Sequence, residues 1–349
     1  MIRSRQARCS LLGCLWLLAA CAWAQAERES IAKESTAKES TASTELELLA
    51  EYPIEGIAGG NLSGLSWCGN ALWAVSDRDD DRIYRLDTSA TPWQAKAEIF
   101  AAPPAPDSGL PWNLRMGASV RGFLFGVGQE KSGALDFEGL ACDAQSNRYL
   151  VSESRAAVLR LGSDGGVEWL ALPPSVVEKA RDQGLLIHFN ALYEGIAVDH
   201  SAGRLWLAAE RQSRGLLLVH RQSPGACSAG CVLLSEGEKV LPPPALGDKP
   251  LFADFSALDF YRGKLYTLER LAHRICRRDG ATGALEKCWS FAATALVDQR
   301  RYDTPYGMAE ALWISADGAL VGVDNNGDTR RDGEQRPIVW RFATPKNGW

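Results

Sequence analysis

The chain has 349 residues and a net charge of −5, with 43 acidic residues against 38 Lys and Arg. This acidic balance argues against nucleic acid as a general partner, because proteins that bind nucleic acid usually carry a basic surface. The length exceeds that of an ordinary single core, but a repeat architecture reaches such a size as one domain.

Residues 1–26 have the pattern of an export signal. Arg3, Arg5 and Arg8 precede the apolar run Cys9–Ala20, which is too short to span a membrane. Leu18-Ala-Ala-Cys21 resembles a bacterial lipobox and predicts lipidation of Cys21. Cleavage after Ala24 or Ala26 by an ordinary signal peptidase is the alternative.

Glu27–Glu45 is a polar stretch that contains Ala-Lys-Glu-Ser-Thr twice in succession and lacks apolar periodicity. Such a sequence does not form a core and suits a tether between an anchor and a domain. We therefore expect a protein exported from a bacterial cytoplasm, either an outer-membrane lipoprotein or a soluble periplasmic protein. Membrane contact is expected only through the lipid anchor, and the oligomeric state is left open.

Residues 46–349 repeat one pattern five times: two short apolar strands joined by a polar turn, with Ser or a carboxylate at each outer end. The paired ends are Ser63 and Asp77, Glu138 and Glu153, Glu194 and Glu210, Ser256 and Glu269, and Glu310 and Asp324. Opposed residues of an antiparallel pair have position numbers with a constant sum. The midpoints fall on the turns, so this register predicts that the two ends of each hairpin lie side by side.

Each hairpin is followed by a third strand-like segment and often by a fourth, as in Arg82–Leu86 and Ala97–Phe100. Four antiparallel strands repeated radially predict an all-β fold, a β-propeller of four-stranded blades. The last unit lacks a fourth strand, which Leu46–Leu49 near the N-terminus would supply and so close the ring. One helix is expected, at Ser175–Gln183.

The spacing of the repeats predicts five blades and leaves a sixth open. The second-strand acids from Glu153 to Asp324 recur at intervals of 57, 59 and 55 residues, but the interval from Asp77 to Glu153 is 76. The extra residues include Gly122–Val127, which reads as an inserted hairpin or a degenerate blade.

Six cysteines follow the leader, and an even number in an exported chain predicts three disulfides. Cys276 and Cys288 flank a hairpin turn, and Cys227 and Cys231 enclose a tight turn. Cys68 and Cys142 remain, each at the turn end of a hairpin. A bond between them requires adjacent blades.

A five-fold arrangement places the hairpin ends at one mouth of a central channel. Carboxylates there would hold a hard cation such as Ca²⁺, and guanidinium groups would hold phosphate or carboxylate. The alternative is that these charges only solvate strand ends. The candidate metal ligands are Asp77, Glu153, Glu210, Glu269, Asp324, Asn326 and Asp328; the candidate substrate-binding residues are Arg78, Arg155, Arg211 and Arg270; the candidate catalytic residues are Glu138, Glu194, Glu310 and His188.

Two loops have acids or amides at alternate positions, starting at Asp77 and at Asp324. This spacing resembles the first ligands of a calcium loop, although neither loop has Gly at the sixth position. An Asp/Asn-rich turn is the competing interpretation. His188 precedes the third hairpin and would act as an acid or base if it reaches the mouth; a hydrogen-bonded structural His is the alternative.

The hairpin motifs resemble those of the bacterial phytase-like family, described as having esterase-like activity of phytase. The matching segments are Gly59–Leu65, Asp136–Ala141, Tyr193–Ala197, Phe255–Leu258 with Leu268–Arg270, and Ala309–Leu312 with Val323–Gly327. The sequence departs from the pattern at Ala311, where Gly is expected, and at Ser256. The resemblance implies a propeller and hydrolysis of phosphoric or other esters. A lactonase-like enzyme with one channel cation and a non-catalytic envelope binding module are the alternatives.

Overall fold

The computed structural model describes residues 44–349 except 59, 112–113, 115–132, 171, 173, 189–191, 200–202, 211–212, 221–231, 238 and 305–307. The predicted export signal, Cys21 and most of the tether lie outside the described residues. So do Arg211, Cys227, Cys231 and the segment Gly122–Val127. No helix among the described residues combines the length and the apolar character needed to cross a membrane.

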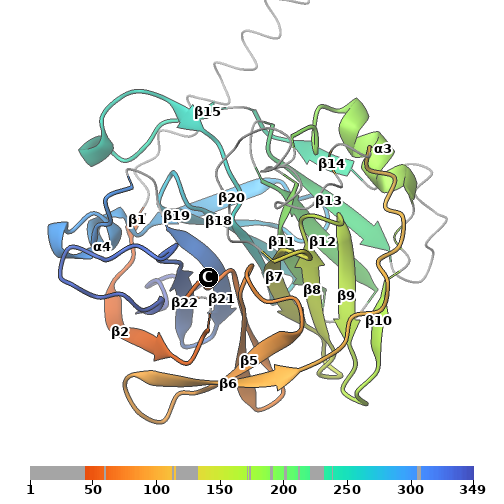
Figure 1. Cartoon of the computed structure of the whole chain (residues 1–349). Helices are drawn as coiled ribbons and strands as arrows, with labels where there is room; N and C mark the ends of the chain where they lie inside the picture. Colours follow the sequence, from red (N-terminus) through yellow and green to blue (C-terminus); the bar gives the residue numbers. More distant parts are fainter. Residues whose placement is uncertain are drawn as a thin grey trace, which may run out of the picture. The chain divides into compact units, whose positions relative to one another are not determined.

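The unit Thr44–Trp349 is built from strands, as predicted (Figure 1). Blade one consists of β3 (Gly64–Cys68), β4 (Ala71–Val75), β5 (Arg82–Asp87) and β6 (Trp93–Ile99). Blade two consists of β7 (Phe137–Cys142), β8 (Arg148–Ser152), β9 (Ala157–Leu161) and β10 (Val167–Trp169). Blade three consists of β11 (Tyr193–Val198), β12 (Arg204–Ala209), β13 (Gly215–His220) and β14 (Val232–Ser235). Blade four consists of β17 (Ala257–Tyr261), β18 (Lys264–Glu269), β19 (Arg274–Asp279) and β20 (Leu285–Ser290). Blade five consists of β21 (Ala309–Ser315), β22 (Gly318–Val323), β23 (Ile338–Phe342) and the N-terminal strand β2 (Leu48–Glu55).

The N-terminal strand closes the ring, as predicted. β2 pairs antiparallel with β23, with Tyr52 opposite Val339, and parallel with β6, with Ile54 opposite Trp93. The strand begins at Leu48 instead of the predicted Leu46 and continues to Glu55. It joins blades five and one into one eight-stranded sheet. An edge that would otherwise be open is thereby paired.

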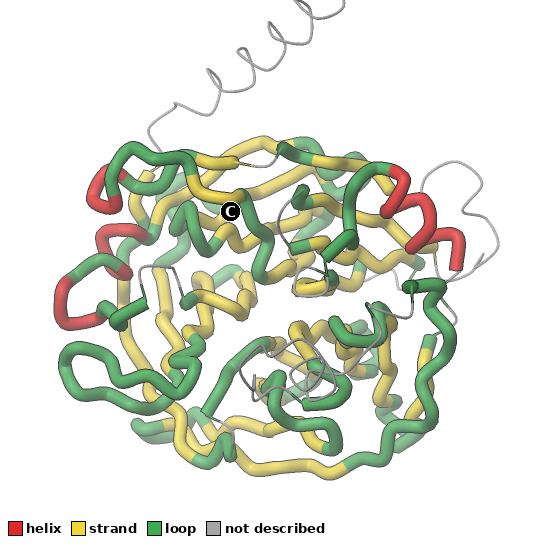
Figure 2. Tube along the Cα trace, turned by 45° about the horizontal axis from the view of Figure 1, so that its top comes forward, coloured by secondary structure: helices red, strands yellow, loops and turns green. Residues whose placement is uncertain are grey.

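The inner strands confirm five blades within the described residues. The innermost strand of each blade contacts that of the next blade: β3 contacts β7, β7 contacts β11, β11 contacts β17 and β17 contacts β21. β21 contacts β3, which completes the ring. Figure 2 shows the sheets around a common centre, with the helical segments at the outside of this unit. Since β3 touches β7 directly, no further blade separates them at the inner ring.

Small residues at the start of the inner strands allow this close approach. A Cβ on Gly64 would lie 2.7 Å from the backbone nitrogen of Leu140 in the next blade. Blade five has Ala311 at the equivalent position, and its hairpin partner is Gly322. A Cβ on Gly322 would lie 2.8 Å from that of Ala311. The departure from the family motif at Ala311 is therefore compensated by a glycine across the hairpin.

Two predicted disulfides are confirmed. Cys68 and Cys142 join the turn ends of β3 and β7, with Cα atoms 5.5 Å apart, so blades one and two are adjacent. Cys276 and Cys288 are opposed in β19 and β20, with Cα atoms 4.0 Å apart.

The remaining elements lie between or outside the blades. The predicted helix is α3 (Pro174–Asp182), and α4 (Ala292–Ala295) is a further short helix. Three short strands are β1 (Thr44–Glu45), β15 (Lys239–Val240) and β16 (Leu251–Phe252), and two 3₁₀ segments span Pro244–Leu246 and Asp298–Arg300. β1 pairs parallel with β20, so the last two residues of the predicted tether belong to a sheet.

Candidate active site at the acidic mouth

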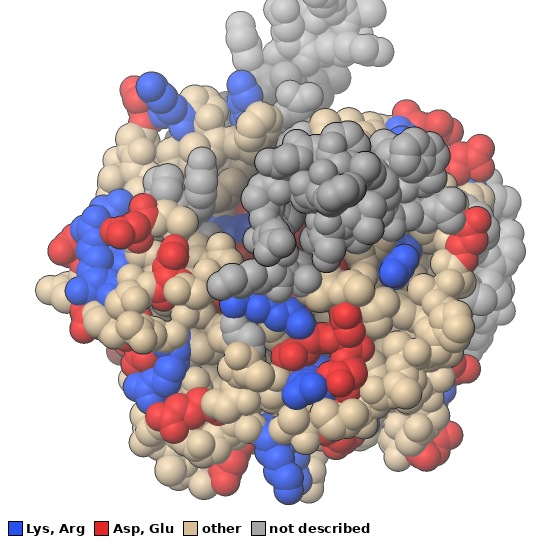
Figure 3. Space-filling view, in the orientation of Figure 1, with Lys and Arg blue, Asp and Glu red and all other residues tan. Residues whose placement is uncertain are grey.

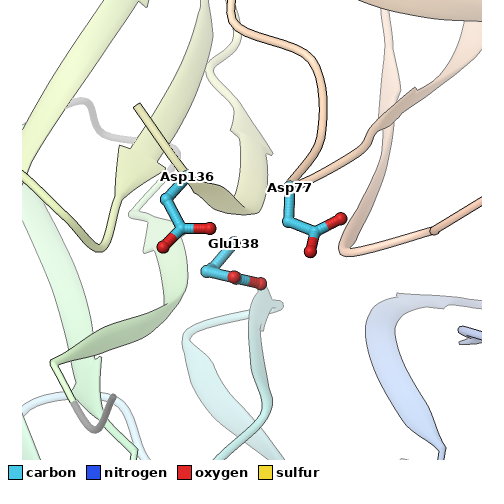
Figure 4. A group of neighbouring side chains, drawn as sticks. All are labelled: Asp77, Asp136 and Glu138. Carbon is cyan, nitrogen blue, oxygen red and sulfur yellow. The ribbon is translucent and has the colours of Figure 1, made fainter. Parts of the chain in front are cut away.

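The structure brings most of the predicted acids together at the hairpin ends, in two clusters. In the first cluster, Asp77, Asp136 and Glu138 each offer a carboxylate oxygen within 4.8 Å of the others. In the second cluster, Glu153, Glu194 and Glu210 do the same. Figure 4 shows the first cluster, in which Asp77 approaches from one chain segment and Asp136 and Glu138 from another. The surface view in Figure 3 shows acidic and basic side chains intermingled on this unit.

A β-bulge sets the position of each glutamate in the inner strands. In the β7–β8 pair, Phe137 is opposite Ser152 but Gly139 is opposite Val151, so Glu138 is the extra residue. The same register shift occurs at Glu194 and Glu310. Bulges re-aim side chains and are common beside active sites. The prediction that Glu138 directly opposes Glu153 is therefore wrong by one residue, although both still lie at the mouth.

Blades one and four carry Ser in place of this glutamate and have no such bulge. Ser256 begins a regular pair in which Ala257 opposes Leu268, so Ser256 faces Glu269 as predicted. The Ser63 hydroxyl accepts a hydrogen bond of 3.1 Å from the backbone N–H of Asp77. The bulge thus accompanies Glu, and the regular ladder accompanies Ser.

Burial makes the negative charge of the first cluster costly. The pKa of Glu138 is raised well above its usual value, first by burial and then by the negative charges of Glu194 and Asp136. Burial also raises the pKa of Asp77, although Asn61 donates a hydrogen bond of 3.1 Å to it and Arg78 attracts its charge. Carboxyl groups held this way favour either protons or a cation.

Several buried oxygens at the mouth accept no hydrogen bond from any described residue. They are Asn61 Oδ1, Asp77 Oδ1, Glu310 Oε2 and Asn325 Oδ1. Asn61 and Asn325 are each only 2 % exposed. Buried polar atoms are normally satisfied, so such a group calls for an ion or an ordered water. An all-oxygen donor set fits a hard cation such as Ca²⁺.

Blade four contributes a guanidinium group to the mouth. Arg270 donates through Nη1 to Glu310, through Nη2 to Glu210, and through Nε to Asp254 at 3.1 Å. Burial opposes the charge of Arg270, but the surrounding carboxylates outweigh burial and raise its pKa. The predicted substrate-binding residue is therefore held by three acids from three blades.

Glu310 and Asp324 in blade five are both poorly solvated. Burial outweighs the attraction of Arg270 and raises the pKa of Glu310 to about 8. Burial also raises the pKa of Asp324 to about 6, against a hydrogen bond of 2.8 Å from the backbone N–H of Asn326.

Glu269 is not brought into either cluster. Its buried carboxylate pairs with Arg214 at 2.8 Å, Arg274 at 2.7 Å and Arg278 at 3.2 Å. Burial opposes ionisation, but these guanidinium groups outweigh it and lower the pKa of Glu269. Glu269 therefore belongs to an ion-pair network that joins blade four to Arg214 of blade three.

The two loops with alternating acids do not converge on one point. Tyr84 donates to Asp79 at 2.5 Å, and Asp80 accepts from the backbone N–H groups of Ala134 and Leu135 at 2.8 and 2.7 Å. Asp81 pairs with Arg82 at 2.7 Å. These bonds are those of a polar turn, the competing interpretation.

The loop after β22 is similar. Exposed Asn326 accepts from Arg78 Nη2 at 3.4 Å, which links blade one to blade five. The backbone N–H of half-buried Asp328 donates to the Asn325 carbonyl oxygen at 2.6 Å. Asn325 is the buried amide of this loop.

Two other candidates, His188 and Arg155, are not members of either cluster. His188 is exposed in the connection between α3 and β11, and within the described residues it makes no hydrogen bond or ion pair with the mouth acids. Arg155 is half-buried two residues beyond Glu153. Its Nε is buried and has no hydrogen-bond partner among the described residues.

Sequence reasoning missed Asn61, Asp136, Asp254 and Asn325. A signal was present for three of them, because Asn61, Asp136 and Asp254 each stand two residues before the repeated Ser or Glu. Extending the alignment of the repeats by these two positions would have added the three residues to the candidate site. Asn325 had no equivalent in the other repeats.

The chain was also compared with curated proteins and with solved structures. No curated protein matches the chain. Among solved structures, a glutaminyl cyclase from Myxococcus xanthus is similar with a TM-score of 0.46 and 11% identity, over 85% of this chain and 94% of that one. A PQQ-bound aldose sugar dehydrogenase from Streptomyces coelicolor has a TM-score of 0.45 and 12% identity, over 86% and 99%.

A family model matches the part of the chain that holds the first hairpin motifs. The model of the phytase-like family, described as esterase-like activity of phytase, matches residues 57–219. This segment covers the first two blades, strands β11 to β13 of the third blade and every residue of the two carboxylate clusters. The resemblance of the hairpin motifs to the phytase-like family is thus confirmed over residues 57–219, a segment shorter than half of the chain.

Proposed function

We propose that this phytase-like propeller is a cation-dependent hydrolase of phosphoric or other esters, with its reaction centre at the first cluster. The observation that carries the proposal is the set of buried acceptor oxygens beside Asp77 and Glu138 that receive no hydrogen bond from described residues. A divalent cation would satisfy these oxygens and offset the charge that burial makes costly.

The residues of the mouth divide into three roles. Asp77, Asp136 and Glu138 would hold the cation, with the amide oxygen of Asn61 beside them. A bound divalent cation would polarise an ester oxygen and stabilise developing negative charge. The anionic group of a substrate would be oriented by Arg78, which already bridges blades one and five.

Glu310 is suited to protonate a leaving group. Its Oε1 accepts from Arg270, while its Oε2 accepts no hydrogen bond from any described residue. Since its pKa is about 8, the carboxyl is mostly protonated at neutral pH. A carboxyl with a pKa near the working pH is an effective general acid.

The test is a metal analysis of the purified chain, with thermal melts in EDTA and in Ca²⁺, Mg²⁺ or Mn²⁺. We expect the melting temperature to rise with one of these ions, and p-nitrophenyl phosphate or acetate to be cleaved only in its presence. Glu138→Gln should abolish both effects, whereas the exposed control Glu98→Gln should retain them. A chain that binds none of these ions and cleaves no ester would contradict the proposal.

One observation favours a second candidate within the same chemistry. Arg270 already neutralises part of the second cluster, which leaves room for a single cation and resembles the expectation for a lactonase-like propeller. Comparing phosphate monoesters with lactones as substrates decides between the two. If neither class is cleaved while the cation still binds, the mouth belongs to a binding module.

We infer that the chain works outside the cytoplasm, as its leader predicts. The support is the pair of disulfides at Cys68–Cys142 and Cys276–Cys288, which favour an oxidising compartment. Cys21→Ser should release the protein from membranes without changing its melting temperature. A wild-type chain already soluble, with its N-terminus at Gln25 or Glu27, would contradict lipidation.

A further inference from the structure

A groove lies at the turn ends of the hairpins, away from the acidic mouth. It runs along the seam between blades five and one and has a cavity volume of about 440 Å³. Trp67 and Trp313, on inner strands β3 and β21, line one part of it, and Tyr52 and Trp93, on outer strands β2 and β6, line another. The volume is within the usual range for small-molecule sites.

Aromatic rings form the apolar wall of this groove. The rings of Trp67 and Trp313 have centroids 5.7 Å apart and are tilted by 30°, whereas those of Tyr52 and Trp93 are stacked at 4.4 Å and 14°. Trp67 is 40 % exposed and is the one tryptophan among the exposed large apolar side chains of the described residues. Keeping such a ring in water forgoes a large gain from burial, which suggests that a ligand covers it.

The rim of the groove is polar, and it carries one negative and one positive side chain, Asp317 and Arg341. Thr88, Ser315, Asp317 and Arg341 line it, and Thr88, Asp317 and Arg341 are exposed. Within the described part of the chain, no ion pair or side-chain hydrogen bond occupies the carboxylate of Asp317 or the guanidinium of Arg341. A cation would meet Arg341 and an anion would meet Asp317, so the lining suits a neutral ligand that offers several hydroxyl groups.

We propose that this groove is a carbohydrate-binding site for a neutral saccharide of about two sugar rings. The C–H faces of a pyranose ring would lie against Trp67 and Trp313, and its hydroxyls would donate to Asp317 and accept from Arg341. The site lies at the opposite ends of the hairpins from the mouth and does not depend on the hydrolase proposal.

The experiment titrates the full chain with cellobiose, maltotriose and chitobiose, followed by tryptophan fluorescence and calorimetry. We expect saturable binding of at least one of them, and about tenfold or greater loss of affinity in Trp67→Ala or Trp313→Ala, as expected for lost aromatic stacking. Asp317→Asn and Arg341→Gln, which change exposed side chains, should weaken binding without lowering the melting temperature.

Two control variants establish whether the saccharide binds in this groove. Trp169→Ala removes a half-buried tryptophan of β10 outside the groove and should leave saccharide affinity unchanged, as should Glu138→Gln at the mouth. Absence of binding to all three saccharides overturns the proposal. Wild-type affinity in both Trp67→Ala and Trp313→Ala also overturns it, as does preferential binding of a proline-rich peptide or tetramethylammonium.

Discussion

The two carboxylate clusters at the mouth have the same chemical groups but are balanced in different ways. In the second cluster, Glu210 receives the guanidinium of Arg270, and Glu153 accepts from the backbone N–H of Leu192 at 2.9 Å. In the first cluster, Asp77 receives an amide N–H from Asn61, and its other oxygen accepts nothing from described residues. The protein's own guanidinium group thus offsets part of the second cluster, whereas a cation from solution is the counter-charge that we propose for the first.

Replacing the internal cation should have the largest effect. Arg270→Met leaves Glu210, Glu310 and Asp254 buried without their shared partner, so we expect a loss of about 3–5 kcal/mol in the free energy of unfolding. Added Ca²⁺ should restore part of this loss by entering the second cluster. Chemical denaturation with and without Ca²⁺ measures both.

Arg277→Met is the matched control in the same blade. Arg277 pairs with Glu286 at 2.8 Å near the surface, and removing it should cost about 0–1 kcal/mol. Equal losses in Arg270→Met and Arg277→Met would show that the second cluster needs no internal cation.

The disulfide at the opposite end of the first cluster's hairpins should matter next. Cys68–Cys142 spans 74 residues and Cys276–Cys288 only 12, so a Cys68→Ser/Cys142→Ser chain should lose about 2–4 kcal/mol, more than Cys276→Ser/Cys288→Ser loses. Blades one and two build the first cluster, so the first double variant should also weaken cation binding. Unchanged cation affinity would show that packing alone aligns these blades.

Replacing one carboxylate in each cluster should show which cluster binds the cation. We expect Glu138→Gln to weaken cation binding by about 100-fold and Glu194→Gln by less than about tenfold, because only the first cluster would ligate directly. Isothermal calorimetry with Ca²⁺ gives both values. A larger loss of affinity in Glu194→Gln than in Glu138→Gln would indicate that the cation binds at the second cluster.

The pH dependence of stability should be smaller but diagnostic. Folding raises the pKa of Glu310 from 4.5 to about 8, so its contribution is fully present below pH 4.5 and is lost as the pH rises through 8. In EDTA, the melting temperature should therefore fall between pH 5 and 9. Glu310→Gln should flatten this profile, and a rising wild-type profile would contradict the assignment.

The repeats, their strand order and the closing strand were predictable because each depends on local patterns that recur. Ring closure by residues near Leu48 followed from a blade that lacked a strand, and the Cys68–Cys142 bond followed from equivalent turn positions. These inferences need only the periodicity of strands and the rule that edges are paired.

The balance of charge at the mouth was not predictable in the same way. A bulge changes which residue faces the channel. The pattern of polar and apolar residues in β7 does not predict the bulge at Glu138. Glu269 matches the repeat in sequence, yet its partners Arg214 and Arg278 come from another blade and from the next strand. Such partners are fixed only when the blades pack.

The closing strand also sets the order in which the molecule can be completed. Tyr52 in β2 pairs with Val339 in β23, so the ring closes only when its first and last strands along the sequence meet. Until then, blade five lacks its outer strand and the ring has an open edge prone to pairing with other chains. Contacts so distant along the chain are slow to form. The interval before β2 and β23 pair is therefore when aggregation competes most strongly with folding.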